Sequence, residues 1–85
     1  MTDDQVAWTA RQFAVLANGA AWAIPSSGLI FTRRGESTLV LLSRMPHGAN
    51  MAISEAQLRE QQQSDYEEIK TRAEAAGITV KDETT

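Results

Sequence analysis

Two short apolar runs separated by a glycine constrain this chain more than any other feature. Leu29–Thr32 and Leu39–Leu42 flank the dipeptide Gly35-Glu36. Glycine at the first central position of a two-residue loop suits a type II′ turn, because that position needs a positive φ. The stretch Leu29–Arg44 is therefore predicted to form a β-hairpin, around which the rest of the fold is arranged.

The length of the hairpin loop decides which side chains share a face. A two-residue or a four-residue loop pairs Phe31 with Val40, whereas a three-residue loop shifts the pairing by one and exchanges the faces of one strand. With the first pairing, side-chain alternation gives two apolar faces: Leu29, Phe31, Val40 and Leu42 with Arg33 at the tip, and Ile30, Thr32, Leu39 and Leu41. Because a solvent-facing sheet normally has one polar face, both faces need a cover, either two helices or one helix layer plus a second subunit.

The N-terminal segment has the pattern of a helix over residues 4–17, ended by Asn18-Gly19. Beside its main apolar stripe, Trp8 and Val15 form a second apolar strip. Exposed aromatic patches are uncommon on monomers. Two interpretations follow: either this helix is buried on more than one side, or Trp8 and Val15 contact another subunit or a partner.

The C-terminal half begins with a capping box, in which Ser54 and Gln57 satisfy each other's backbone N–H groups. The helix that it opens is expected to end at about Ala76. A strand–helix–strand crossover of this length would place Ile78–Val80 parallel to Thr38–Ser43.

These elements predict one small α+β domain over residues 1–80 and a flexible tail over residues 81–85. The domain consists of an N-terminal helix, an antiparallel β-hairpin and a long C-terminal helix. Ala20–Pro25 would extend the hairpin to a three-stranded sheet, and Ile78–Val80 would add a short last strand.

Two likenesses of topology accompany this prediction. With Ala20–Pro25 counted as a strand, the order α-β-β-β-α is similar to that of double-stranded-RNA-binding domains, but the second helix starts with Ser54–Arg59 and not with lysines. Without that strand, the order α-β-β-α is similar to that of small phage head-completion proteins. Neither likeness comes with a matched motif, so no family is assigned.

Composition argues against several classes of protein. The 85 residues include no cysteine, which excludes disulfides and thiol chemistry and fits a cytoplasmic protein. Met45, His47 and Met51 share a loop but are weak evidence for a metal site. The single histidine has no catalytic partner at a telling spacing, and no phosphate loop follows a strand. No membrane segment, enzyme activity, metal or cofactor is therefore expected.

The excess of apolar surface predicts a non-enzymatic protein–protein interaction module that self-associates, most economically as a homodimer. An adaptor, an inhibitor, or a phage or mobile-element accessory protein would fit, with an unidentified protein partner. The candidate interface residues are Trp8, Val15, Ile30, Leu39 and Leu41.

Charge supports one alternative and one further candidate surface. Arg33 and Arg34 at the hairpin tip, together with the tryptophans, suggest nucleic-acid or nucleotide binding. However, the net charge is −3, and residues 54–85 alone carry eight acids against four bases. This balance argues against a dedicated duplex-DNA binder. The second helix offers an acidic face for a basic partner, made of Glu60, Asp65, Glu67, Glu68 and Glu74.

Overall fold

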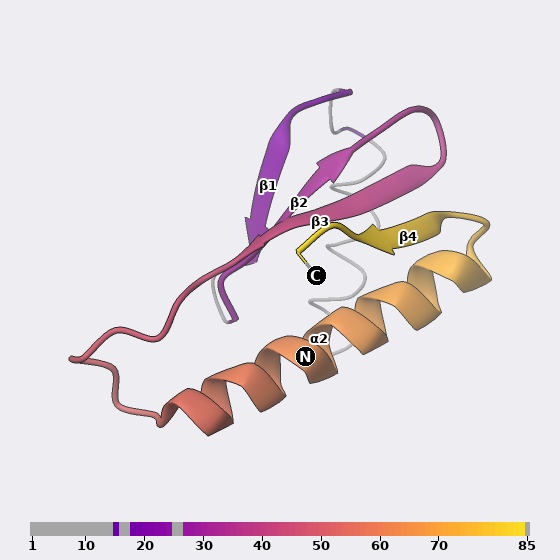
Figure 1. Ribbon diagram of the computed structural model, residues 1–85. Coiled ribbons are helices and arrows are strands. Elements are labelled where there is room, and N and C mark those ends of the chain that lie inside the picture. The colour runs from indigo at the N-terminus through magenta and orange to yellow at the C-terminus, as the bar shows by residue number, and fades with distance from the viewer. Residues whose placement is uncertain (1–14, 16–17, 25–26, 85) are drawn as a thin grey trace.

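The computed structural model describes residue 15, residues 18–24 and residues 27–84. These form a four-stranded mixed sheet with a long helix across one face (Figure 1). The elements are β1 (Ala21–Ile24), β2 (Leu29–Arg33), β3 (Thr38–Arg44), α2 (Glu55–Ala75) and β4 (Thr79–Asp82). The α+β architecture is thus confirmed in outline. All of the predicted N-terminal helix except Val15 lies outside the described residues.

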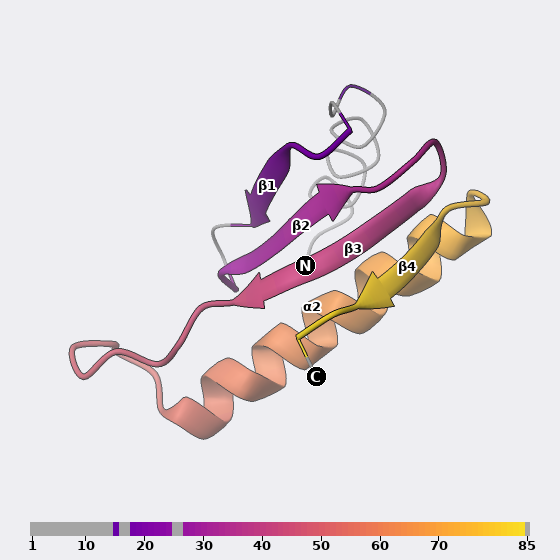
Figure 2. The ribbon, with the colours of Figure 1, turned by 45° about the horizontal axis from the view of Figure 1, so that its top comes forward.

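The strands lie in the order β1-β2-β3-β4. The first three are antiparallel neighbours, and β4 runs parallel to β3 after the crossover through α2 (Figure 2). The predicted last strand, parallel to β3, is therefore confirmed. The structure also has the additional strand before the hairpin, β1, which makes the antiparallel part three-stranded. Beyond β4, the backbone N–H of Glu83 donates to the carbonyl of Leu41 at 3.1 Å. Ordered pairing thus extends past residue 80, where a flexible tail was expected.

The pairing of β2 with β3 differs from the predicted one. The Arg34 N–H donates to the Thr38 carbonyl at 2.9 Å, which closes a three-residue loop over residues 35–37. Phe31 consequently pairs with Leu41 and not with Val40. Gly35 in this loop has φ +85°, as its predicted turn role requires. The prediction of which residues share a face was wrong because a one-residue shift moves every side chain of one strand to the other side.

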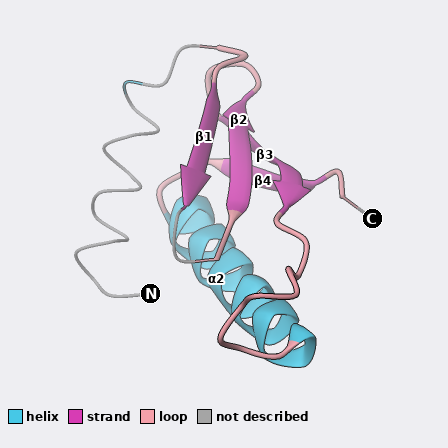
Figure 3. Cartoon of the chain, turned by 90° about the vertical axis from the view of Figure 1, so that its left-hand side faces the viewer, coloured by secondary structure: helices cyan, strands magenta, loops and turns pink. Residues whose placement is uncertain are grey.

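One face of the sheet packs on α2 and forms the core (Figure 3). Its members come from all four strands and from the helix: Trp22, Ile24, Leu29, Phe31, Leu39, Leu41, Val80, Tyr66 and Ile69. The rings of Trp22 and Phe31 lie 5.7 Å apart between centroids, tilted by 32°. The other face carries Thr32 and Val40, both buried, with Ile30 half-buried and Leu42 41% exposed.

Local signals at both ends of α2 explain its bounds. The Ser54 side chain accepts from the Gln57 N–H at 3.2 Å, and the Gln57 side chain accepts from the Ser54 N–H at 3.0 Å. This confirms the capping box. At the other end Gly77 has φ +86°, and the Ile78 N–H donates to the Ala73 carbonyl at 2.9 Å. The left-handed glycine thus turns the chain back toward the sheet.

Candidate functional site

The predicted interface residues are dispersed in the structure. Leu39 and Leu41 are 1% and 0% exposed and belong to the core beneath α2. Ile30 lies on the opposite face and is half-buried, while Val15 is 77% exposed. Trp8 lies outside the described residues. The shifted pairing removes Leu39 and Leu41 from the surface of a monomer; self-association itself stays a prediction.

The two arginines of the hairpin tip are engaged within the chain. Arg33 donates from Nε to the Gly35 carbonyl at 2.9 Å and from Nη2 to the Glu36 carbonyl at 3.1 Å. Arg34 forms an ion pair with Glu83, and this hydrogen-bonded carboxylate raises the pKa of the Arg34 guanidinium. Glu83 therefore offsets the charge of Arg34, whereas the hydrogen bonds of Arg33 to carbonyl groups leave its charge in place.

The predicted acidic face is only partly a surface. Glu60, Glu67 and Glu74 are exposed and recur every seven residues, so they share one side of α2. Asp65 is 3% exposed and lies among the buried residues, and Glu68 is half-buried. The face therefore consists of three glutamates, one of which, Glu67, already accepts a hydrogen bond from Gln63.

Among the described strands, β1 forms one edge of the sheet and β4 forms the other. The strand reads Ala-Trp-Ala-Ile, with Ala21 and Ala23 exposed. The carbonyl of Ile24 accepts from the N–H of Gly28, on the β2 side. Because backbone groups of an antiparallel strand point to alternate sides, those of Ala21 and Ala23 point outward. This edge strand has no charged residue, and its exposed side chains are small; such an edge pairs readily with another strand.

The opposite edge, β4, is protected. It carries Lys81, which is exposed, and Asp82, which forms an ion pair with Arg44. Charged side chains on an edge strand discourage pairing with another chain. The two edges of the sheet therefore differ in their capacity to accept a partner strand.

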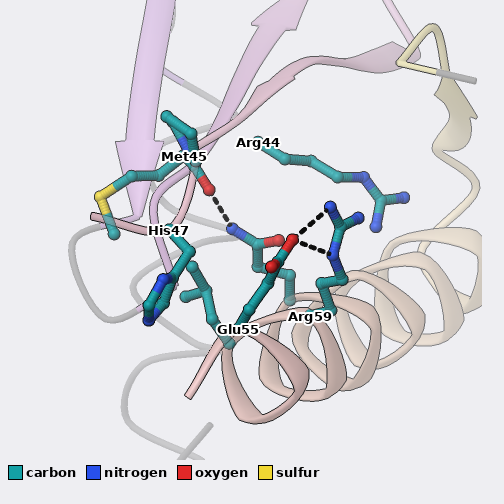
Figure 4. A pocket seen from close by; sticks show the side chains of 8 residues that line it. Arg44, Met45, His47, Glu55 and Arg59 are labelled. Atoms are coloured by element: carbon teal, nitrogen blue, oxygen red, sulfur yellow. Dashed lines mark hydrogen bonds and ion pairs between the residues drawn. The ribbon is translucent and has the colours of Figure 1, made fainter. Parts of the chain in front are cut away.

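A cavity of about 230 Å³ lies where β3, the following loop and α2 meet (Figure 4). A β-bulge places Arg44 in its wall. Phe31 pairs with Leu41 but Ile30 pairs with Ser43, which leaves Leu42 as an extra residue on β3. A bulge re-aims the side chains that follow it. Arg44 follows the core residue Leu41 by three positions, so strict alternation of side chains would place it on the face of the sheet opposite α2. Because of the bulge it lies on the face that packs on α2.

Arg44 is fixed by several contacts. It pairs with Asp82 at 2.5 Å, donates from Nε to the Thr84 hydroxyl at 3.0 Å, and lies over the Tyr66 ring at 5.8 Å from its centroid. Burial tends to raise the pKa of the Asp82 carboxyl, but hydrogen bonds from Thr84 and Arg44 outweigh it and hold that pKa below its usual value. Burial, helped by the Asp82 charge, raises the pKa of Tyr66.

Arg59 contributes a second guanidinium from the first half of α2. Its Nε and Nη2 both donate to one oxygen of Glu55, at 3.2 and 2.9 Å. This pair is exposed, with 74% and 61% of the two side chains accessible. The bonds from Arg59 lower the pKa of the Glu55 carboxyl. Arg59 and Arg44 both line the cavity (Figure 4).

Gln62 joins the cavity to the sheet. Its Nε2 donates to the Met45 carbonyl at 2.8 Å and to the Ser27 carbonyl at 3.1 Å, so one side chain of α2 holds two loops. At the rim, His47 Nε2 donates to the Ile53 carbonyl at 2.7 Å. The full lining is Arg44, Met45, Pro46, His47, Glu55, Leu58, Arg59 and Gln62.

This site mixes fixed cationic donors with apolar walls, a chemistry suited to binding an anion. In the described part of the chain, no group of three or more His, Cys, Asp or Glu is placed to hold a metal. None of the described helices is long and apolar enough to cross a membrane. No family model, curated protein or solved structure matches this chain.

Proposed function

We propose that this protein is a small, non-enzymatic protein–protein interaction module that self-associates by pairing β1 with β1 of a second copy. The observation that carries the proposal is the contrast between the two edges of the sheet. The β1 edge is uncharged and exposes Ala21 and Ala23, whereas the β4 edge carries Lys81 and Asp82.

A two-fold axis through the middle of β1 suits this strand. Antiparallel pairing about Trp22 would set Ala21 opposite Ala23 of the second copy, and Ala23 opposite Ala21 of the second copy. Since these are the residues with outward backbone groups, the pairing would form four hydrogen bonds and join two four-stranded sheets into one. The alanine side chains are small enough for close approach of the second strand.

The free energy that these four hydrogen bonds can contribute predicts a weak dimer. Backbone hydrogen bonds contribute about 0.5–1.5 kcal/mol each net, so four give about 2–6 kcal/mol before the entropy of association is subtracted. A dissociation constant of 1 mM corresponds to about 4 kcal/mol. Even the upper figure corresponds to only about 40 μM before that subtraction, so we expect a dissociation constant in the millimolar range. Reversible association of this strength suits a module that exchanges partners.

Sedimentation equilibrium over a series of protein concentrations tests the proposal. The highest concentration, about 1 mM, is set by the expected dissociation constant. The average mass is expected to rise from 9.3 kDa toward twice that value. Ala23→Lys adds a charge to the β1 edge at an exposed position and should weaken the dimer at least tenfold without unfolding the protein.

Thr79→Lys is the matched control, because it puts the same charge at an exposed position of the β4 edge. It should leave the association unchanged. A wild-type protein that stays at 9.3 kDa throughout the series, or an Ala23→Lys variant that associates as well as the wild type, would refute pairing through β1.

A further inference from the structure

We infer that the cavity between Arg44 and Arg59 is a binding site for a carboxylate on a short aliphatic group, such as a C-terminal residue or an acidic side chain of another polypeptide. The site is separate from the β1 edge and does not depend on self-association. Its evidence is the arrangement of donors, the fixed position of Arg44, the exposed Glu55–Arg59 pair and the size of the cavity.

Both guanidinium groups keep donors for a ligand. Arg59 uses Nε and Nη2 on a single oxygen of Glu55, and its Nη1 has no partner among the described residues. Among the described residues, Arg44 Nη1 donates to the Gln63 side chain alone, at a long 3.4 Å. Because guanidinium N–H groups form a planar fork that matches a carboxylate, two arginines that line one cavity can both donate to an anion bound there (Figure 4).

Arg44 is held in place before any ligand arrives. Asp82, Thr84 and the Tyr66 ring fix its guanidinium, and only 25% of the side chain is exposed. A donor that is already ordered loses little conformational freedom on binding. Asp82 balances the charge of Arg44 in the folded chain, so the attraction of an incoming anion depends on Arg59 as the second cation.

Glu55 occupies the position on Arg59 that an external carboxylate would take. Exposed ion pairs four residues apart on a helix shift an equilibrium by only about twofold. Glu55 is therefore a weak internal competitor, and its removal should improve binding. A merely structural role of the Glu55–Arg59 pair predicts no such gain.

The dimensions and the walls restrict the ligand. A volume of about 230 Å³ is below the range of about 300–1,000 Å³ typical of drug-sized ligands, so it suits one side chain or chain end. Leu58, which is 2% exposed, gives the cavity an apolar wall, and Met45 and Pro46 also line it. A carboxylate with a few carbons satisfies both parts of the lining.

A titration with N-acetyl-leucine tests the inference, monitored by NMR of the arginine Nε–H groups. N-acetyl-leucinamide, which has the same apolar part without the charge, is the matched ligand control. The acid should shift the Arg59 and Arg44 signals saturably at constant ionic strength, and the amide should not. N-acetyl-glutamate α-amide, titrated in parallel, distinguishes an acidic side chain from a chain end as the preferred source of the carboxylate.

Two variants give opposite results if the site is real. Arg59→Gln should weaken binding at least fivefold, and Glu55→Gln should strengthen it about twofold or more. Their controls are Lys70→Gln and Glu74→Gln, which make the same charge changes at exposed positions farther along α2 and should leave binding unchanged. Since Glu55→Gln is a gain of binding, loss of folding cannot imitate it.

The inference is overturned if acid and amide give equal shifts, if Arg59→Gln binds as the wild type does, or if Glu55→Gln is no tighter than wild type. The titration is made at protein concentrations where the chain is monomeric. Its failure would therefore leave pairing through β1 untouched, and the absence of a dimer would leave the carboxylate site untouched.

Discussion

Replacing Gln62 by leucine removes the side chain that holds two loops to α2. Gln62 is 3% exposed, and its amide donates to the carbonyls of Ser27 and Met45 at 3.1 and 2.8 Å. The Ser27 carbonyl lies in a buried contact, and a buried polar group left without a partner costs about 1–3 kcal/mol. The Met45 contact is part-buried, so water can replace the amide there and the loss is about 0.5–1.5 kcal/mol.

The added apolar contact of leucine offsets part of this loss. We expect Gln62→Leu to lower the free energy of unfolding by about 1–3 kcal/mol, measured by urea denaturation followed by circular dichroism. Domains of this size are stable by about 4–13 kcal/mol, so the change is large but leaves a folded protein.

Gln63→Leu is the matched control, because the same residue type is replaced at the next, exposed position of the helix. Its contacts are surface bonds with Glu67 and Arg44, and the expected change is within about 0.5 kcal/mol. The reasoning fails if the two variants lose the same stability, or if Gln62→Leu stays within about 0.5 kcal/mol of the wild type.

Two more measurements follow from the structure. Gly28 has φ +70° and an added Cβ would lie 2.3 Å from Met45 Cβ, whereas Gly35 has φ +85° and open space. Gly35→Ala should cost about 1–2 kcal/mol of unfolding free energy and Gly28→Ala about 1–3 kcal/mol more; equal losses would contradict the close contact. The folded pKa of Asp82 is lowered, so its stabilisation exists above its ordinary pKa of 3.8 and is lost as pH falls through the folded value. Asp82→Asn should therefore destabilise the protein at pH 7 by about 1–2 kcal/mol, with the difference disappearing in acid; a loss independent of pH would show that its charge is not the cause.

Sequence reasoning succeeded where the signals are local. Ser54 and Gln57 lie within one helical turn, and their capping box fixes the start of α2. Gly77 fixes its end in the same way. The parallel placement of β4 followed from chain connectivity, because a helix between two strands of one sheet permits little else.

The pairing of the hairpin could not be predicted in the same way. It depends on whether the loop has two, three or four residues, and Gly35 is compatible with each. The bulge at Leu42 adds a second shift that no local pattern indicates. As a result Leu39 and Leu41, expected on an interaction face, lie in the core.

The cavity was missed because its parts come from distant positions. Arg44 reaches it only through the bulge, and its partner Asp82 belongs to a segment that was expected to be a flexible tail. Gln62 is one of the buried residues of α2. Its two carbonyl partners lie 17 and 35 positions earlier in the chain, and no spacing rule connects them.

The position of β4 has a consequence for the order of folding. The pairs between β1 and β2 join residues at most 11 positions apart, as from Ala21 to Thr32, whereas Thr38 and Thr79 are 41 positions apart. Long loops are entropically harder to close and slow the step that closes them. We therefore expect the antiparallel strands and α2 to associate first and β4 to join after the rate-limiting barrier. Contacts of β4 should then affect the unfolding rate more than the folding rate.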